Sequence, residues 1–209
     1  RLHMGYRPRG FVPLRHLHGS VSFQTRRYFV TASHESRLFP GDPVKLVDGS
    51  IRRVNVSGVG SALEPPVLGV IARLYNTNGR PLTFNQPTAG PSLDASAAGY
   101  ADIYDDPDIT FLVNSTTSVS ANLIGQFVRT TAATANTAAG ISGFRVETTD
   151  TTASAISHRW QIMGVSPEHR IGLVTEQGLE GVSATDIEVK IADHLFRRQR
   201  NRIAGSVGP

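Results

Sequence analysis

Two short segments hold the side chains whose types and spacing could support chemistry. In the first, His16 and His18 stand two residues apart, with His3 nearby in the sequence. An extended backbone would place both imidazoles of the pair on one side, as zinc or nickel would require. Two imidazoles are too few for a structural metal site, and no acidic residue lies near them in the sequence. We therefore predict neither a metal ion nor another cofactor.

The second segment contains Asp102, Asp105, Asp106 and Asp108. Their oxygens could bind calcium, but Pro107 interrupts the run, and the glycine and terminal glutamate of a helix–loop–helix site are missing. Pro107 disfavours a helical conformation at the preceding residue, and aspartates bond to nearby backbone amides in turns. The pattern predicts a capped β-turn. A glycosidase pair would need carboxylates from two strands that face one cleft, which a sequence does not show.

Other catalytic patterns are weak or missing. The chain has no Gly-x-Ser-x-Gly elbow of a serine hydrolase, and the glycine-rich segments 58–60 and 140–143 lack the lysine of a phosphate-binding loop. A small β-fold hydrolase that used Asp102, Asp105 and His158 stays open as an alternative, and loss of turnover on alanine substitution would reveal it. Trp160 lies in an apolar run and is predicted to fill the core. We expect a protein that is not an enzyme.

The composition is typical of a loop-rich β protein. Cysteine is absent, and charged residues make up only 18% of the 209 residues. Glycine, proline, serine, threonine and alanine separate short apolar runs. No run reaches the roughly twenty apolar residues that a membrane helix needs, and no signal-peptide pattern follows the basic start. We expect no membrane insertion and no secretion.

The net charge of +4 is unevenly distributed, because arginines gather at both ends of the chain. These are Arg1, Arg7, Arg9, Arg15, Arg26 and Arg27 at one end and Arg197, Arg198, Arg200 and Arg202 at the other. This pattern favours two basic arms on a nearly neutral body. Aromatic residues are not interleaved with the arginines as in a base-stacking groove, so we do not expect nucleic-acid binding beyond nonspecific phosphate contact.

The apolar patterns predict a mainly β fold, a sandwich or barrel of about eight to nine short strands with one short helix. Asp48-Gly49 between two β-prone runs predicts a tight hairpin over Val44–Ile51. The spacing of apolar residues within Ser118–Val128 predicts the helix. Surface loops are expected over Thr83–Ala98 and Thr130–Ser142. Further strands are expected over 21–30, 67–75, 100–104, 109–113, 144–148, 158–165 and 186–194.

The same patterns divide the chain into three parts. An extended N-terminal arm spans 1–19, a β-rich body spans 20–195, and a basic C-terminal tail spans 196–209. The arm contains Pro8, Pro13 and several glycines, has little periodicity and is expected not to bury a face on its own.

Several motifs carry a resemblance to a known family. Ala101–Val113, with its Tyr-Asp-Asp-Pro turn between two strands, is the most specific of them. The others are Met4–Pro8 with Leu14–Leu17, Phe39–Leu46, Trp160–Val165 and Ile187–Ile191. Together they span most of the chain, which resembles the head-decoration, or capsid cement, proteins of tailed bacteriophages.

The resemblance implies a virion structural protein, made in the host cytoplasm, that sits on the outside of the phage head and clamps neighbouring subunits of the major capsid protein. Exposed sheet edges favour a closed homo-oligomer, with a trimer ahead of a dimer. An extended arm could lie in a groove of the partner, with its arginines facing coat carboxylates. The expected contact residues are Arg7, Pro8, Arg9, Phe11, Arg15, His16, Arg197, Arg198 and Arg200.

Two other virion roles were weighed. A phage tail or receptor-binding component is the main alternative, and the copy number per virion would distinguish it from a cement protein. The major coat protein itself is disfavoured, because its fold needs a long spine helix that this sequence does not predict.

Overall fold

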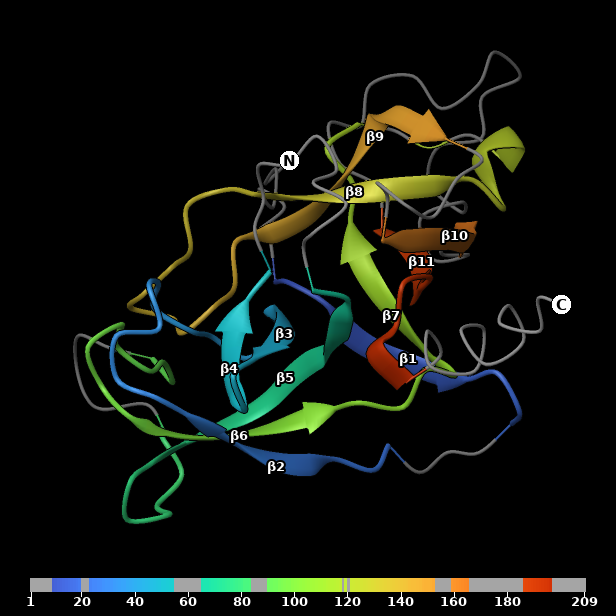
Figure 1. Ribbon diagram of the computed structural model, residues 1–209. Coiled ribbons are helices and arrows are strands. Elements are labelled where there is room, and N and C mark those ends of the chain that lie inside the picture. Colours follow the sequence, from blue (N-terminus) through green and yellow to red (C-terminus); the bar gives the residue numbers. More distant parts are fainter. Residues whose placement is uncertain are drawn as a thin grey trace, which may run out of the picture.

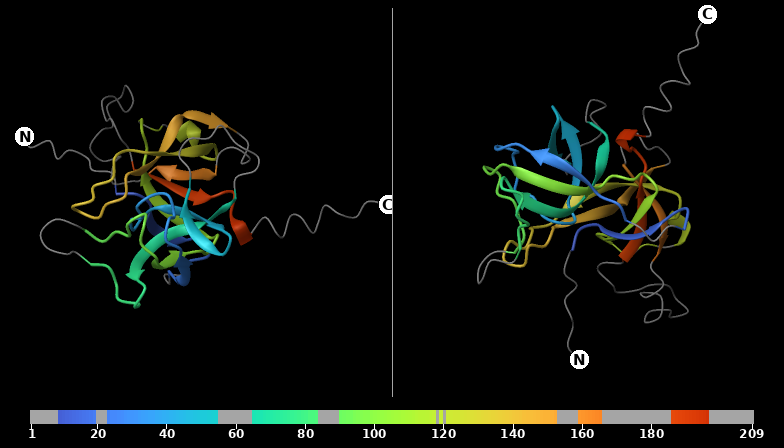
Figure 2. Two further views of the ribbon diagram at one scale, coloured as in Figure 1. Left: turned by 60° about the vertical axis from the view of Figure 1, so that its left-hand side comes forward. Right: turned by 90° about the horizontal axis from the view of Figure 1, so that it is seen from below.

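The computed structural model describes residues 9–19, 23–54, 65–83, 90–117, 119, 121–152, 159–165 and 186–196. The predicted mainly β class is confirmed, with eleven strands in two antiparallel sheets over these residues, an arrangement consistent with a sandwich. The strands outnumber the eight or nine expected. None of the helical turns in the described part of the chain has the length and hydrophobicity of a membrane span. The two sheets lie next to each other in every view (Figures 1 and 2).

One sheet has six strands in the order β1-β7-β11-β10-β8-β9, and the other has five in the order β2-β6-β5-β3-β4. The strands of the first are β1 (Val12–His16), β7 (Ile109–Asn114), β8 (Phe127–Ala132), β9 (Phe144–Thr152), β10 (Trp160–Val165) and β11 (Asp186–Ile191). Those of the second are β2 (Arg26–Val30), β3 (Pro43–Val47), β4 (Ser50–Arg53), β5 (Val67–Asn76) and β6 (Gly99–Tyr104).

The hairpin between β3 and β4 confirms the expectation from Asp48-Gly49. Val47 pairs with Ser50, and the two turn residues have φ values of 50° and 76°. Both values lie in the left-handed region that a two-residue type I′ turn requires, and aspartate and glycine tolerate it better than other residues. The local sequence therefore determines the register of this pair.

The buried side chains form two hydrophobic clusters. One contains Trp160, Phe111 and Phe144 of the six-stranded sheet together with Val67 and Val70 of β5, and so joins the two sheets. The other, which contains Leu68 and Ile103, lies within the five-stranded sheet. The five-stranded sheet curves enough that the end of β2 reaches β4, where the Thr31 amide donates a 2.9 Å hydrogen bond to the Ser50 hydroxyl. The core position predicted for Trp160 is therefore found.

The N-terminal segment differs from the expected free arm over its described part, 9–19. It is extended, but β1 pairs antiparallel with β7, and Phe11 is 1% exposed. The Phe11 ring stacks on Trp160 with a centroid distance of 4.1 Å and an interplanar angle of 22°. Phe11 is expected at a partner interface, whereas the structure packs most of its ring into the core. Burial of this aromatic ring in the core holds β1 against the body, although the sequence of this segment shows no periodic pattern of apolar residues.

Two local expectations are corrected. Among the described residues of Ser118–Val128, the structure has a single 3-10 turn, η1 (Ala121–Leu123), before β8 begins at Phe127. The loop expected over Thr130–Ser142 is present but begins later, because β8 continues to Ala132, and the Asn136–Ile141 bridge closes it into a compact connection to β9. In both places pairing with β9 and β10 overrides the weak local preference of a short segment.

Truncation of Phe11 tests whether the N-terminal segment belongs to the body. We expect Phe11→Ala to lower the free energy of unfolding by about 3–5 kcal/mol, because it leaves a cavity beside Trp160. The matched control is Val12→Ala, at a side chain that is 39% exposed, which we expect to change stability by less than about 0.5 kcal/mol. Urea denaturation followed by tryptophan fluorescence measures both. Equal, small effects of the two substitutions would contradict the packing described above.

Candidate functional site: the surface of the N-terminal strand

Strand β1 forms one edge of the six-stranded sheet and is tied to the body at both ends. The Phe11 amide donates to the Gly41 carbonyl at 2.9 Å, and the Leu17 amide donates to the Asp108 carbonyl at 2.9 Å. Between these bonds, Val12 pairs with Leu112 and His16 with Ile109. The strand is therefore a fixed surface element.

A glycine permits the close approach at the start of this strand. Gly10 has a φ of 71°, and a Cβ there would lie 2.6 Å from both the Gly41 carbonyl oxygen and Ser142 Cβ. Only glycine fits both the backbone angle and the space. The chain thereby passes tightly against the turn at Pro40-Gly41, which belongs to one of the motifs that carry the family resemblance.

Arg9 and Arg15 bind carboxylates of their own chain. Arg9 Nη2 lies 2.7 Å from Asp186 Oδ2, and Arg15 holds both carboxylate oxygens of Glu188 at 2.7 and 2.9 Å. Asp186 and Glu188 belong to β11, on the far side of β7 from β1. The two arginines were expected to face coat carboxylates, and in this structure intramolecular partners occupy their hydrogen-bonding groups. Asp186 and Glu188 were missed as partners, because they lie more than 170 positions from the two arginines in the sequence.

In both ion pairs the arginine side chain is much more exposed than its carboxylate partner. The arginine side chains are 44% and 61% exposed, whereas those of Asp186 and Glu188 are only 4% and 10% exposed. Burial raises the pKa of Asp186 to about 6, and the adjacent Arg9 guanidinium favours the ionised carboxylate. The pairs thus satisfy nearly buried acids and leave the arginine stems at the surface.

No acidic residue lies near His16 and His18 in the sequence, but the fold brings Asp106 and Asp108 next to them. His16 Nε2 lies 3.0 Å from Asp106 Oδ2, and His18 Nε2 lies 3.4 Å from Asp108 Oδ2. The predicted capped turn is present, because Asp106 Oδ1 accepts the Asp108 amide at 2.9 Å. Burial tends to raise the pKa of Asp106, but the hydrogen bonds from the Asp108 amide and His16 outweigh it and leave this pKa below its ordinary value.

The other two aspartates of that segment have different partners. Asp102 accepts hydrogen bonds from Arg27 at 2.9 Å and from the Tyr75 hydroxyl at 2.6 Å, and Asp105 accepts the Tyr28 hydroxyl at 2.6 Å. The four aspartates therefore do not form one calcium site. His158, the third residue of the hydrolase alternative, lies outside the described residues, as do Arg7, Pro8, Arg197, Arg198 and Arg200.

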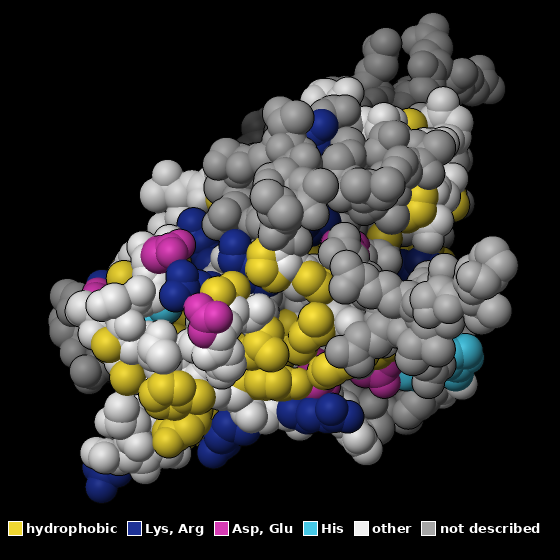
Figure 3. Space-filling model, viewed as in Figure 1, with side chains coloured by type: hydrophobic (Ala, Val, Ile, Leu, Met, Phe, Trp, Pro, Cys, Tyr) yellow, Lys and Arg dark blue, Asp and Glu magenta, His cyan; other side chains and the backbone are white. Residues whose placement is uncertain are grey.

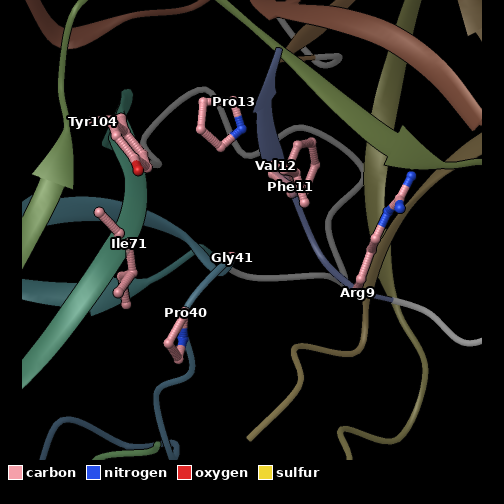
Figure 4. A pocket seen from close by; sticks show the side chains of 9 residues that line it. Arg9, Phe11, Val12, Pro13, Pro40, Gly41, Ile71 and Tyr104 are labelled. Carbon is pink, nitrogen blue, oxygen red and sulfur yellow. The ribbon is translucent and has the colours of Figure 1, made fainter. Parts of the chain in front are cut away.

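An apolar cleft of about 180 Å³ runs beside β1. Phe11, Val12 and Pro13 line one side and Ile71 and Tyr104 the other, while Pro40 and Gly41 close one end (Figure 4). Arg9 borders the cleft and points away from it (Figure 4). Pro13 has no backbone N–H to donate to a further strand. Pairing of another strand with β1 is therefore disfavoured. Contacts to a partner here would have to come mainly from side chains.

Apolar side chains are unusually exposed along this strand. Val12, Leu14 and Leu17 are 39%, 43% and 37% exposed and lie within six consecutive positions, and Val12 also lines the cleft. Further apolar side chains gather on the face over β5 and β6, with arginine and lysine side chains at the border of the group (Figure 3). We call the surface formed by Val12, Leu14, Leu17 and the cleft the strand-one surface.

A second cavity, of about 270 Å³, is more polar. Arg26, Asp105, Asp106 and Phe196 are among the residues that line it. The Arg26 guanidinium lies 5.8 Å from the Phe196 ring centroid and 3.5 Å from Asp105 Oδ2. Arg26 thus has both an acidic and an aromatic partner in this cavity.

Comparisons of the chain with protein-family models, curated proteins and solved structures return no match.

A buried acid lies beneath the strand-one surface. Asp42 follows Gly41 and is 0% exposed, and its Oδ2 accepts the Phe39 amide at 3.0 Å. Burial raises the pKa of Asp42 to about 7, although the Ser142 hydroxyl, the Phe39 amide and the Arg53 charge favour ionisation. Near pH 5 the folded protein therefore holds a proton on Asp42 that an unfolded chain, with an aspartate pKa of 3.8, has lost.

This proton gives a pH-dependent contribution to stability. Only the folded state binds it between about pH 4 and 7, so Asp42 lowers the free energy of unfolding as pH rises through that window. We expect Asp42→Asn, which keeps the shape without the charge, to be more stable than wild type above pH 7, by up to about 4 kcal/mol. The advantage should shrink towards pH 4. Urea denaturation of both proteins across this range measures it, and a difference independent of pH would contradict the assignment.

Proposed function

We propose that this protein is a structural component of a tailed-phage head that binds the outside of the coat shell in many copies and stabilises contacts between major capsid subunits. The observation that carries the proposal is the strand-one surface. Three apolar side chains within residues 12–17 are exposed there, on a segment that is fixed at both ends, and Val12 also lines the apolar cleft. Single exposed apolar residues are common on protein surfaces, but several within six positions of the chain, next to an apolar cleft, are typical of an interaction site.

The rigidity of β1 supports docking rather than catalysis. Phe11 in the core and the ion pairs of Arg9 and Arg15 hold the surface in place before any partner binds. A preformed surface loses little conformational entropy on binding, so even a small patch retains useful affinity. Repetition over a shell, and self-association as a closed trimer, would add avidity.

Two of the motifs that carry the family resemblance lie at or next to the strand-one surface. Leu14–Leu17 and the Tyr-Asp-Asp-Pro turn are two of its motifs, and they contact each other through His16 with Asp106 and through the Leu17 amide with the Asp108 carbonyl. These motifs thus serve one structural unit at the edge of the six-stranded sheet. Their role in the proposal is to shape a docking surface, and no catalytic step belongs to it.

Binding to undecorated, expanded phage heads tests the proposal. We expect saturable binding of the purified protein in sedimentation with heads, and we expect Leu14→Asp to weaken it by at least about tenfold, or about 1.4 kcal/mol, because a charge would be buried in an apolar contact. The matched control is Ile124→Asp, at a side chain that is also 43% exposed but lies outside the strand-one surface.

The outcomes separate the candidate roles. The control should bind heads as wild type does, and circular dichroism should show both variants folded. A wild-type protein that ignores heads, or a Leu14→Asp variant that binds them as tightly as wild type, would overturn the proposal. Quantification in virions adds a further criterion, since hundreds of copies fit a cement protein and a handful fit a tail component.

A further inference from the structure

Side chains from two distant segments converge beyond the end of β1. His16, Asp106 and Asp108 each offer one ligand atom, and these atoms all lie within 4.8 Å of one another. His18 joins them, with its Nε2 3.4 Å from Asp108 Oδ2. The histidines and the aspartates are about ninety residues apart in the chain, so the fold alone brings them together.

We propose that this cluster is a binding site for one divalent transition-metal ion, with zinc as the best fit. Imidazole nitrogens and carboxylate oxygens bind zinc at about 2.0–2.2 Å, so two ligands of a tetrahedral ion lie about 3.3 Å apart. The contacts of 3.0 Å between His16 and Asp106 and 3.4 Å between His18 and Asp108 are close to that separation. The mixed nitrogen and oxygen donors favour zinc, cobalt or nickel over calcium, which prefers oxygen ligands.

Most of the site is positioned before an ion arrives. The Asp108 amide donates to Asp106 Oδ1 and orients that carboxylate, while the bond from the Leu17 amide to the Asp108 carbonyl holds the two segments together. The His16 side chain is only 13% exposed. Outer hydrogen bonds of this kind orient ligands and strengthen metal binding. His18, whose side chain is 74% exposed, has room to swing onto the ion as a fourth ligand.

Ion binding has one identifiable cost. His16 Nδ1 accepts the His18 amide at 3.2 Å, so in the metal-free protein the ring proton is on Nε2 and points to Asp106. An ion at Nε2 moves that proton to Nδ1 and removes the hydrogen bond from the His18 amide. That bond is exposed and long, so the His18 amide can turn to water with little loss.

The ion would fasten the end of β1 to the turn between β6 and β7. It would add a crosslink where the present contacts are exposed or half-buried polar pairs, which are weak in water. This inference does not rest on head binding, and either proposal can fail without the other.

Zinc titration of the full chain tests it. Protein without a histidine tag is stripped with a chelator and titrated with zinc chloride by calorimetry. We expect one ion per chain, and at a free zinc concentration a hundredfold above Kd we expect Tm to rise by roughly 5–10 °C. Cobalt(II) should give the visible spectrum of a four-coordinate nitrogen and oxygen site.

Three substitutions locate the ion. Asp106→Asn and Asp108→Asn keep the side-chain shape and should each weaken zinc binding by at least about tenfold, as His16→Ala should. The matched control, Asp48→Asn in the exposed hairpin turn, should bind as wild type does. Circular dichroism in chelator shows which variants are folded, and the two asparagine variants keep the test valid if His16→Ala unfolds. No zinc binding by the wild type, or undiminished binding by the folded asparagine variants, would overturn the proposal.

Discussion

Burial of the Phe11 ring against Trp160 is the interaction on which the edge of the six-stranded sheet depends. The two rings are 1% and 0% exposed and stack at 4.1 Å, so this contact gains the hydrophobic free energy of a fully buried aromatic side chain, about 2–3 kcal/mol. The ion pairs of Arg9 and Arg15 are half exposed, and each contributes at most about 1 kcal/mol. Phe11 therefore anchors β1, and the polar pairs and the apolar surface follow from its position.

Local signals predicted much of the fold. Asp48-Gly49 encoded its hairpin because a type I′ turn needs residues that tolerate positive φ, and the strand expected over 186–194 is found as β11 (Asp186–Ile191), which is buried at nearly every position. The short helix was wrong because four apolar residues at helical spacing are weak evidence where a strand can form instead. Leu93 lay in an expected surface loop, yet it is 3% exposed and pairs with Leu38 across the fold.

The candidate site was only partly predictable, because its contacts join residues far apart in the sequence. Arg9, Arg15 and His16 are predicted from the sequence as contact residues, but their partners Asp186, Glu188 and Asp106 in this structure lie about 90 to 177 positions away. The charge pattern of a sequence predicts that an arginine pairs with a carboxylate, but it does not identify that carboxylate. Phe11 was placed at a partner surface because a proline- and glycine-rich segment gives no periodic sign of burial.

A fixed edge strand is compatible with the repeated docking that we propose. Pro13 blunts the edge against uncontrolled strand pairing, while Val12, Leu14 and Leu17 leave apolar area for a partner. The Tyr-Asp-Asp-Pro turn holds the end of that strand in place, because Asp106 contacts His16 and the Asp108 carbonyl accepts the Leu17 amide. The proposed head binding and the proposed metal ion thus both use one unit, in which the end of the chain is held against a turn in its middle.

An engineered disulfide tests the docked position of β1 most directly. The chain has no cysteine, and Val12 faces Leu112 in the β1–β7 register, at the Cα separation of an antiparallel pair, which a disulfide can span. Oxidised Val12→Cys/Leu112→Cys protein, resolved by non-reducing electrophoresis and peptide mass spectrometry, should contain one disulfide within each chain at nearly full yield. Free thiols, or disulfides that join two chains, would contradict the account.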